Sequence, residues 1–173
     1  MHMTMKNNSE AEKGINLTIV PYKDIYREKV TEITLYAWQG IYDEYKRRLG
    51  TKMFEDLYGD WKETKVARVM SGMNSGKGYV ALIGGEVAGF IYYVPDYKKK
   101  LGTVEENAVS KEYLGNGIGK RLYDFVLSEM KKDGLIYAMV GTGLDDAHAA
   151  ARKSYIKAGF DRELPSVKYF MEL

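Results

Sequence analysis

Three glycines at alternating positions could bind a phosphate group with backbone atoms alone. Gly115, Gly117 and Gly119 lie in the stretch LGNGIGKR, after a β-rich segment and before an apolar-periodic one. The first turn of a helix has unpaired N–H groups and a partial positive charge, and glycine lets an anion approach because it has no Cβ. Each glycine also costs a helix about 1 kcal/mol relative to alanine. A bound ligand would offset that cost, so the stretch predicts a phosphate cradle, to which the following Lys-Arg pair adds positive charge.

The spacing of these glycines does not fit two other phosphate-binding motifs. A Walker loop, G-x-x-x-x-G-K-[S/T], aligned on Gly119 and Lys120 would need glycine at Leu114 and a hydroxyl at Arg121. A dinucleotide-binding fingerprint, G-x-G-x-x-G, aligned on Gly115 would need glycine at Lys120. A glycine-rich turn without a ligand is the remaining alternative, although three glycines in five residues exceed what a turn requires.

Two segments resemble the GNAT family of acyl-CoA-dependent N-acetyltransferases. The sequence NAVSKEYLGNGIGKRLYDFVL is similar to the family's strand–loop–helix, and its signature, [Q/R]-x-x-G-x-[G/A], matches at Gly117 and Gly119. Leu114 stands where Gln or Arg is usual. The second segment, AARKSYIKAGF at 150–160, resembles the family pattern A-x-x-x-Y-x-K-x-G-F. The resemblance covers roughly residues 15–173.

The resemblance implies that acetyl-CoA is the cofactor and that no metal takes part. Backbone groups of the strand before the glycines would pair with the pantetheine arm, as an added strand does, and hold the acetyl carbonyl. Backbone N–H groups of the glycine-rich turn would hold the pyrophosphate. A histidine stands where the family usually has a cofactor-contacting Asn, and an exposed histidine without function is the alternative. The implied cofactor-binding residues are Asn107, Ala108, Val109, Gly115, Asn116, Gly117, Ile118, Gly119, Lys120 and His148.

The resemblance also implies two catalytic residues, Tyr155 and Glu105. Tyr155 occupies the position of the family's general acid, and a phenol with a pKa of about 10 can protonate the thiolate that leaves when an amine displaces CoA. Glu105 matches an acidic position on the family's strand and would accept a proton from the attacking ammonium, directly or through water. We expect Glu106 to face away from Glu105 because strand side chains alternate. The alternatives are a core tyrosine and a solvated strand end.

The segment LYAWQGIYDEY at 35–45 resembles the aromatic first-helix region of small-molecule acetyltransferases. Aromatic faces and carboxylates together favour a cationic amine. We therefore expect direct attack, in a ternary complex, by a small primary amine or a polyamine, as in the PaiA-like spermidine/spermine acetyltransferases. The alternatives are a helix with aromatic residues in the core, a peptide or protein N-terminus as acceptor, and a non-catalytic acyl-CoA-binding module. The expected acceptor-site residues are Trp38, Tyr42 and Tyr92.

Hydrophobic periodicity predicts the elements that position these residues. The sequence indicates an α/β fold with a mixed sheet, in which the loose leader 1–14 precedes one N-acetyltransferase domain over 15–173. The segment 135–141 is apolar throughout, as is typical of a strand covered on both faces. The predicted order is strand 15–22, helices 24–37, 41–49 and 52–70, a hairpin at 79–96 around Gly84 and Gly85, strand 103–110, a helix from 118, strand 135–141, a helix that begins after Asp145 or Asp146 and ends at Gly159, and a final strand at 166–173.

Composition excludes several other classes of protein. The 173 residues are 45% hydrophobic and 29% charged, as in globular proteins, and the net charge of +2 is too small and too scattered for a nucleic-acid-binding protein. The lack of cysteine excludes disulfides, cysteine catalysis and zinc–thiolate sites. We find neither a long apolar run nor a signal-peptide pattern. We therefore expect a cytoplasmic protein with a small-molecule substrate and no nucleic-acid or membrane partner, and homo-oligomerisation is left open.

Overall fold

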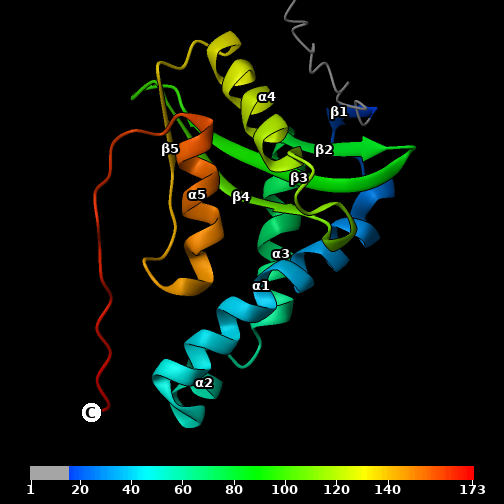
Figure 1. Cartoon of the computed structure of the whole chain (residues 1–173). Helices are drawn as coiled ribbons and strands as arrows, with labels where there is room; N and C mark the ends of the chain where they lie inside the picture. The colour runs from blue at the N-terminus through cyan, green and yellow to red at the C-terminus, as the bar shows by residue number, and fades with distance from the viewer. Residues whose placement is uncertain (1–15) are drawn as a thin grey trace, which may run out of the picture.

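One mixed β-sheet forms the centre of the molecule (Figure 1). The structure is a computed structural model that describes residues 16–173, so the predicted leader lies outside the described residues, and the single domain stays a prediction. The strands, which follow one another across the sheet in chain order, are β1 (Leu17–Pro21), β2 (Gly78–Ile83), β3 (Glu86–Asp96), β4 (Leu101–Val109) and β5 (Tyr137–Val140). Neighbouring strands are antiparallel except β4 and β5, which are parallel.

Helices cover both faces of the sheet. The helices are α1 (Arg27–Leu49), α2 (Thr51–Tyr58), α3 (Trp61–Gly72), α4 (Ile118–Lys132) and α5 (Ala149–Ala158). The apolar stripe of α4, which includes Leu122 and Val126, packs on one face of the sheet, and α5 packs beside it. On the other face, Val30 of α1 and Val69 of α3 pack against the sheet. Apolar residues at helical spacing thus give α1, α3 and α4 one buried side each, whereas α5 is only partly buried.

The helices and the hairpin differ from the predictions only in detail. The helices predicted at 24–37 and 41–49 are one continuous helix, because Gly40 keeps a helical conformation and its cost is small beside the packing of α1. The helix predicted at 52–70 is instead two, α2 and α3, which are separated at Gly59 and Asp60. The predicted hairpin is confirmed. Its turn has φ angles of 58° at Gly84 and 87° at Gly85, which glycine adopts without strain.

Strand β4 contains a β-bulge at Glu105. Glu106 pairs with Tyr92 of β3 and the next pair is Val104 with Tyr93, so Glu105 has no residue opposite it. A bulge inserts one residue and interrupts the alternation of side chains. Glu105 and Glu106 therefore line the same pocket, and the prediction that Glu106 faces away is wrong.

The end of the chain also differs from the prediction. The strand predicted at 166–173 is absent, because the chain after Gly159 does not run beside any strand of the described sheet. Figure 1 shows it in red beside α5, ending near α2, where Lys52 and Glu172 form an ion pair of 2.9 Å. We call residues 160–173 the C-terminal segment. Strand β5 is therefore the edge of the described sheet and is largely exposed, not covered on both faces as its sequence predicted.

The described residues contain neither a membrane-spanning helix nor a group of metal-ligand side chains. Between residues 16 and 173 no helix is both long and apolar enough to cross a membrane. In the same part of the chain, no three His, Cys, Asp or Glu side chains are grouped so that they could hold a metal ion.

Candidate active site

The glycine-rich turn ends in a helix N-terminus that no side chain caps. Gly115 and Gly117 have φ angles of +80° and +72°, a left-handed conformation that favours glycine. Gly117 is the N-cap of α4 and leads directly into Ile118. No side chain accepts a hydrogen bond at this cap, so the first turn keeps backbone N–H groups and a partial positive charge for a ligand. The arrangement fits an anion.

Neither the backbone conformation nor the surroundings of Gly119 require a glycine at this position. It lies in the first turn of α4 with an ordinary helical φ, and a Cβ there would meet only Val109 Cγ2 at 3.8 Å, an ordinary contact. Neither strain nor crowding excludes a larger residue. The missing side chain leaves space in front of the helix N-terminus, and this is the space that a pyrophosphate held by backbone N–H groups would occupy.

The edge of β4 next to the glycine turn is also without a strand partner. β4 pairs with β5 only from Leu101 to Val104, whereas residues 105–109 have no neighbour on that side among the described strands. A groove of about 570 Å³ lies between this part of β4 and α1, and Asn107, Ala108 and Val109 all line it. An unpaired strand edge offers its N–H and C=O groups to an extended ligand. The groove therefore fits the pantetheine arm of a coenzyme A.

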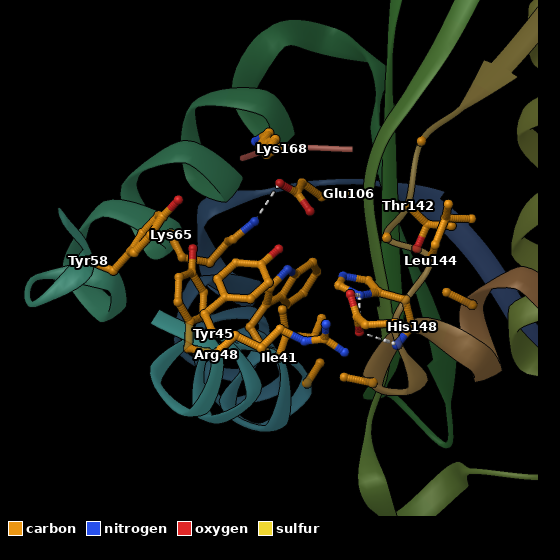
Figure 2. Close-up of a pocket in the computed structure, with 18 of the residues that line it drawn as sticks. Ile41, Tyr45, Arg48, Tyr58, Lys65, Glu106, Thr142, Leu144, His148 and Lys168 are labelled. Atoms are coloured by element: carbon orange, nitrogen blue, oxygen red, sulfur yellow. Dashed lines mark hydrogen bonds and ion pairs between the residues drawn. The ribbon is translucent and has the colours of Figure 1, made fainter. Parts of the chain in front are cut away.

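A larger pocket of about 860 Å³ lies beyond this groove, between α1, β4 and α5. Figure 2 shows Tyr45 and Tyr58 on one wall, with Thr142, Leu144 and His148 opposite. Trp38, Tyr42, Tyr155 and both glutamates of β4 also line it. Asn107 lines both the groove and the pocket, so the two cavities meet at β4.

The two glutamates of β4 are held in an ion-pair network. Lys65 Nζ donates to Glu106 Oε1 at 2.8 Å, and the two side chains are only 10% and 7% exposed. Arg68 bridges both carboxylates, at 2.9 Å from Glu105 Oε2 and 3.3 Å from Glu106 Oε1. Lys65 Nζ also lies 4.6 Å from the centre of the Trp38 ring. Lys65 and Arg68 could not be identified from the sequence, because their partners lie on a strand distant in the chain.

Tyr155 lies at the inner end of the pocket in a group of aromatic rings. Its ring centre is 5.7 Å from that of Tyr123, whose hydroxyl donates to Asn107 Oδ1 at 2.7 Å. Burial raises the pKa of Tyr155, and hydrogen bonds with Thr142 and Tyr123 only partly oppose this effect. The phenol therefore stays protonated near neutral pH and can donate a proton. Tyr123 was missed by the sequence analysis, since its position on α4 indicates only a core residue.

His148 is fixed by Asp145 at the start of the last helix. Both carboxylate oxygens of Asp145 lie 2.8 Å from His148 Nδ1. Burial raises the pKa of Asp145, but the hydrogen bonds and charge of His148 outweigh it and hold that pKa below its usual value. A Cβ at Gly143 would lie 2.5 Å from His148 Nδ1, so a larger residue at this position would clash with the histidine ring. Arg152, which the sequence analysis missed, holds the loop by donating to the carbonyls of Gly143 and Asp145 at 2.7 Å.

The structure brings together most, not all, of the predicted acceptor residues. Trp38 and Tyr42 line the pocket, and Tyr42 stacks on Trp61 with a ring-centre distance of 4.2 Å. Tyr92 is buried in the core instead, and its ring lies so close to Gly72 that a Cβ there would clash. Tyr92 is therefore not part of the pocket lining. The alternation of β3 turns it towards the helices α1 and α3.

Comparison with known proteins agrees with this geometry. The model of the acetyltransferase (GNAT) family matches residues 35–160, whereas a search of the curated proteins finds no match. Similar solved structures include the aminoglycoside N-acetyltransferase AAC(6')-Iy in complex with CoA, with a TM-score of 0.62 at 14% identity over 94% of this chain and 99% of that one.

Two further structures have the same fold. The PaiA N-acetyltransferase of Thermoplasma acidophilum, in complex with coenzyme A, has a TM-score of 0.61 at 19% identity, over 85% of this chain and 91% of that one. A GNAT-family acetyltransferase of Staphylococcus aureus Mu50 has a TM-score of 0.58 at 22% identity, over 83% and 82%. These structures confirm the predicted fold, and coenzyme A in two of them agrees with acetyl-CoA as cofactor. The family match spans most of the chain, which therefore belongs to the GNAT family as an N-acetyltransferase.

Proposed function

We propose that this enzyme transfers the acetyl group of acetyl-CoA to a primary amine by direct attack in a ternary complex. The observation that carries the proposal is the unpaired edge of β4 at residues 105–109, which adjoins both the groove that fits the cofactor and the pocket that contains Tyr155. A chain without cysteine suits a reducing compartment, so the proposal places the enzyme in the cytoplasm.

The cofactor-binding residues fall into two groups in this proposal. Backbone N–H groups of the glycine turn, from Gly115 to Lys120 and including Asn116, hold the pyrophosphate at the uncapped end of α4. The β4 edge formed by Asn107, Ala108 and Val109 holds the pantetheine arm as an added strand would. The cofactor supplies an acetyl thioester, which is an activated acyl group. His148 lines the large pocket, and it is proposed as a further contact to the cofactor.

Proton transfer needs one acid and one base. Tyr155, whose pKa is raised by burial, donates a proton to the departing thiolate. Glu105 is proposed as the base because it is less buried than Glu106 and lies where solvent and a substrate ammonium both reach it. Its hydrogen bond from Arg68 fixes the carboxylate at the pocket wall. A water molecule between Glu105 and the amine would serve the same purpose.

The acceptor is proposed to be a small amine or a polyamine, bound against Trp38 and Tyr42. What supports this is a pocket that joins aromatic faces to carboxylates, the combination that attracts an ammonium group. AAC(6')-Iy and the PaiA enzyme are named as acetyltransferases, and the former also has a structure with a bisubstrate analogue, CoA-S-monomethyl-acetylneamine. A peptide N-terminus is the second candidate, because the exposed C-terminal segment, which contributes Val167 and Phe170 to the pocket lining, offers surface for a longer acceptor.

Thiol release tests this proposal directly. The protein is mixed with acetyl-CoA and a panel of amines, polyamines and peptides, and free thiol is measured over time. We expect amine-dependent thiol release, and also a rise in Tm with CoA, because a ligand that binds only the folded state stabilises it. A rise in Tm without thiol release for any acceptor would indicate a non-catalytic acyl-CoA-binding module. An unchanged Tm at millimolar CoA would reject the cofactor site.

A further inference from the structure

Every carboxylate that lines the large pocket already has a partner. Glu106 is paired with Lys65, and Arg68 bridges Glu106 and Glu105. The third carboxylate, Asp145, is bonded to His148. The cationic side chains that line the pocket are Lys65, Arg68, Lys168 and Arg48, and Arg48 is already paired with Glu44 at 2.6 Å. The other three cations balance the three carboxylates, so the pocket has no surplus negative charge for a second ammonium group.

Lys65 occupies the position that the ammonium of a ligand would take. Its Nζ lies 2.8 Å from Glu106 Oε1 and 4.6 Å from the centre of the Trp38 ring. A carboxylate beside an aromatic face is the combination that binds alkylammonium groups in proteins. Figure 2 shows Lys65 reaching Glu106 at the centre of the pocket. The chain has therefore filled its best cation site with its own side chain.

This arrangement disfavours a polycation for two reasons. A second ammonium group would have to displace Lys65 from Glu106, which would leave a buried lysine without its partner. If it did not displace Lys65, it would lie near Lys65 and Arg68, and like charges at close range are a common means of rejecting a ligand. The amine that is acetylated does not suffer this charge repulsion, because it is uncharged when it attacks.

The rest of the pocket offers apolar and aromatic surface. Tyr42, Tyr45 and Tyr58 contact one another with ring-centre distances of 5.5 to 6.1 Å. Ile41 and Leu144 extend this surface on facing walls. Such a surface packs against a flat ring or an alkyl chain, for which aromatic contacts supply affinity without a charge.

From these contacts we propose that the acceptor is a monoamine with an aromatic or aliphatic body, and that Lys65 selects it against polyamines. The inference rests on the proposed function and narrows its acceptor. Lys65 acts as a specificity-determining residue because it neutralises Glu106 and occupies the site that a second ammonium would need.

Steady-state thiol release from the unmodified enzyme gives the first test. The two acceptors are 2-phenylethylamine and spermidine, each with acetyl-CoA at saturation. We expect kcat/KM for 2-phenylethylamine to exceed that for spermidine by at least about tenfold. A preference for spermidine would overturn the inference and leave the proposed function intact. No thiol release with any amine would instead reject the proposed function, and the inference with it.

The variant Lys65→Met gives the second test. It removes the ammonium group next to Glu106 and leaves that carboxylate with the more distant Arg68 at 3.3 Å, so we expect kcat/KM for spermidine to rise by about tenfold relative to 2-phenylethylamine. Lys65→Arg keeps the positive charge and should keep the preference for the monoamine. Lys132→Met is the matched control, because Lys132 is an exposed lysine of α4 that also pairs with a glutamate, Glu129, at 2.6 Å. If folded Lys65→Met shows the preference of the unmodified enzyme, the role of Lys65 is wrong. If Lys65→Met does not fold, the comparison of the two acceptors with the unmodified enzyme decides alone.

Discussion

At the residue scale, the hydroxyl of Tyr155 is the group on which the proposed chemistry depends most directly. Its ring is held by Tyr123 and Phe160, with ring centres 5.7 and 6.3 Å away, so the phenol has little freedom to turn. Tyr123 in turn donates to Asn107 on the strand proposed to hold the acetyl carbonyl. The acid and the acyl-binding strand are thereby linked through two side chains.

Replacing Tyr155 by Phe should lower kcat by about 100-fold, the usual contribution of a positioned acid, while the Kd of CoA stays unchanged. Burial raises the pKa of Tyr155, so in the unmodified enzyme this acid is protonated at neutral pH and is lost only at a pH above the ordinary pKa of a tyrosine. The kcat–pH profile should therefore fall on the alkaline side, and this fall should be absent in the variant. Tyr97→Phe, at an exposed position outside the pocket, is the control. Equal kcat values for Tyr155→Phe and the unmodified enzyme at every pH would remove Tyr155 from the mechanism.

Substitutions of the two glutamates of β4 should affect different properties, Glu105 the rate of catalysis and Glu106 the stability of the fold. Glu105→Gln should lower kcat by about 100-fold with little change in Tm, because its carboxylate is partly exposed and its ion pair contributes about 1 kcal/mol or less. Glu106→Gln should reduce the free energy of unfolding by about 3 kcal/mol, because it leaves the buried Lys65 without a counter-ion. Denaturant unfolding and thiol release on both variants measure the two effects. The opposite pattern would make Glu106 the base.

At the scale of elements, the glycine-rich start of α4 is the part of the chain whose residues are best explained by binding of a ligand. Gly119→Val should weaken CoA binding by at least about tenfold, because its side chain would fill the space before the first N–H groups. The Tm of the protein without CoA should not fall, since valine is a better helix former than glycine. Ser128→Val, at an exposed position of the same helix, is the control. Unchanged CoA affinity in Gly119→Val, measured by calorimetry, would show that the pyrophosphate binds elsewhere.

The local elements were predicted well because local sequence determines them. The hairpin follows from Gly84 and Gly85, and the end of α5 from Gly159, which has the left-handed φ of a helix C-cap. The bulge at Glu105 could not be predicted, because it depends on how β3 and β4 align. The same limit applies to Lys65, which meets Glu106 across 41 positions of the chain. Contacts between distant segments leave no periodic signal in one sequence.

At the scale of the whole molecule, the C-terminal segment contributes to the pocket more than to the fold. Ser166, Val167, Lys168 and Phe170 line the large pocket, yet residues 161–173 are all exposed. The sequence predicted a strand at 166–173, and the structure has none there because no neighbouring strand is available. The segment crosses from α5 to the first turn of α2, where Glu172 pairs with Lys52.

Ending the chain at Arg162 should raise KM for the acceptor by about tenfold and leave KM for acetyl-CoA unchanged, because the removed residues line only the large pocket. The Tm should fall by no more than a few degrees, since the loss is exposed surface and one surface ion pair of about 1 kcal/mol or less. Steady-state kinetics with each substrate varied in turn would check this. A larger effect on acetyl-CoA than on the acceptor would assign the segment to the cofactor.

The short pairing of β5 with β4 has a consequence for dynamics. Only four residue pairs, from Leu101–Tyr137 to Val104–Val140, join residues 137–158 to the sheet by strand hydrogen bonds. Backbone amides in this region should therefore exchange with deuterium faster than those of β2 and β3, which pair on both edges. A cofactor bound along the unpaired part of β4 would connect residues 137–158 to the rest of the sheet. CoA should therefore slow exchange in β5 and α5 far more than at the distant hairpin turn.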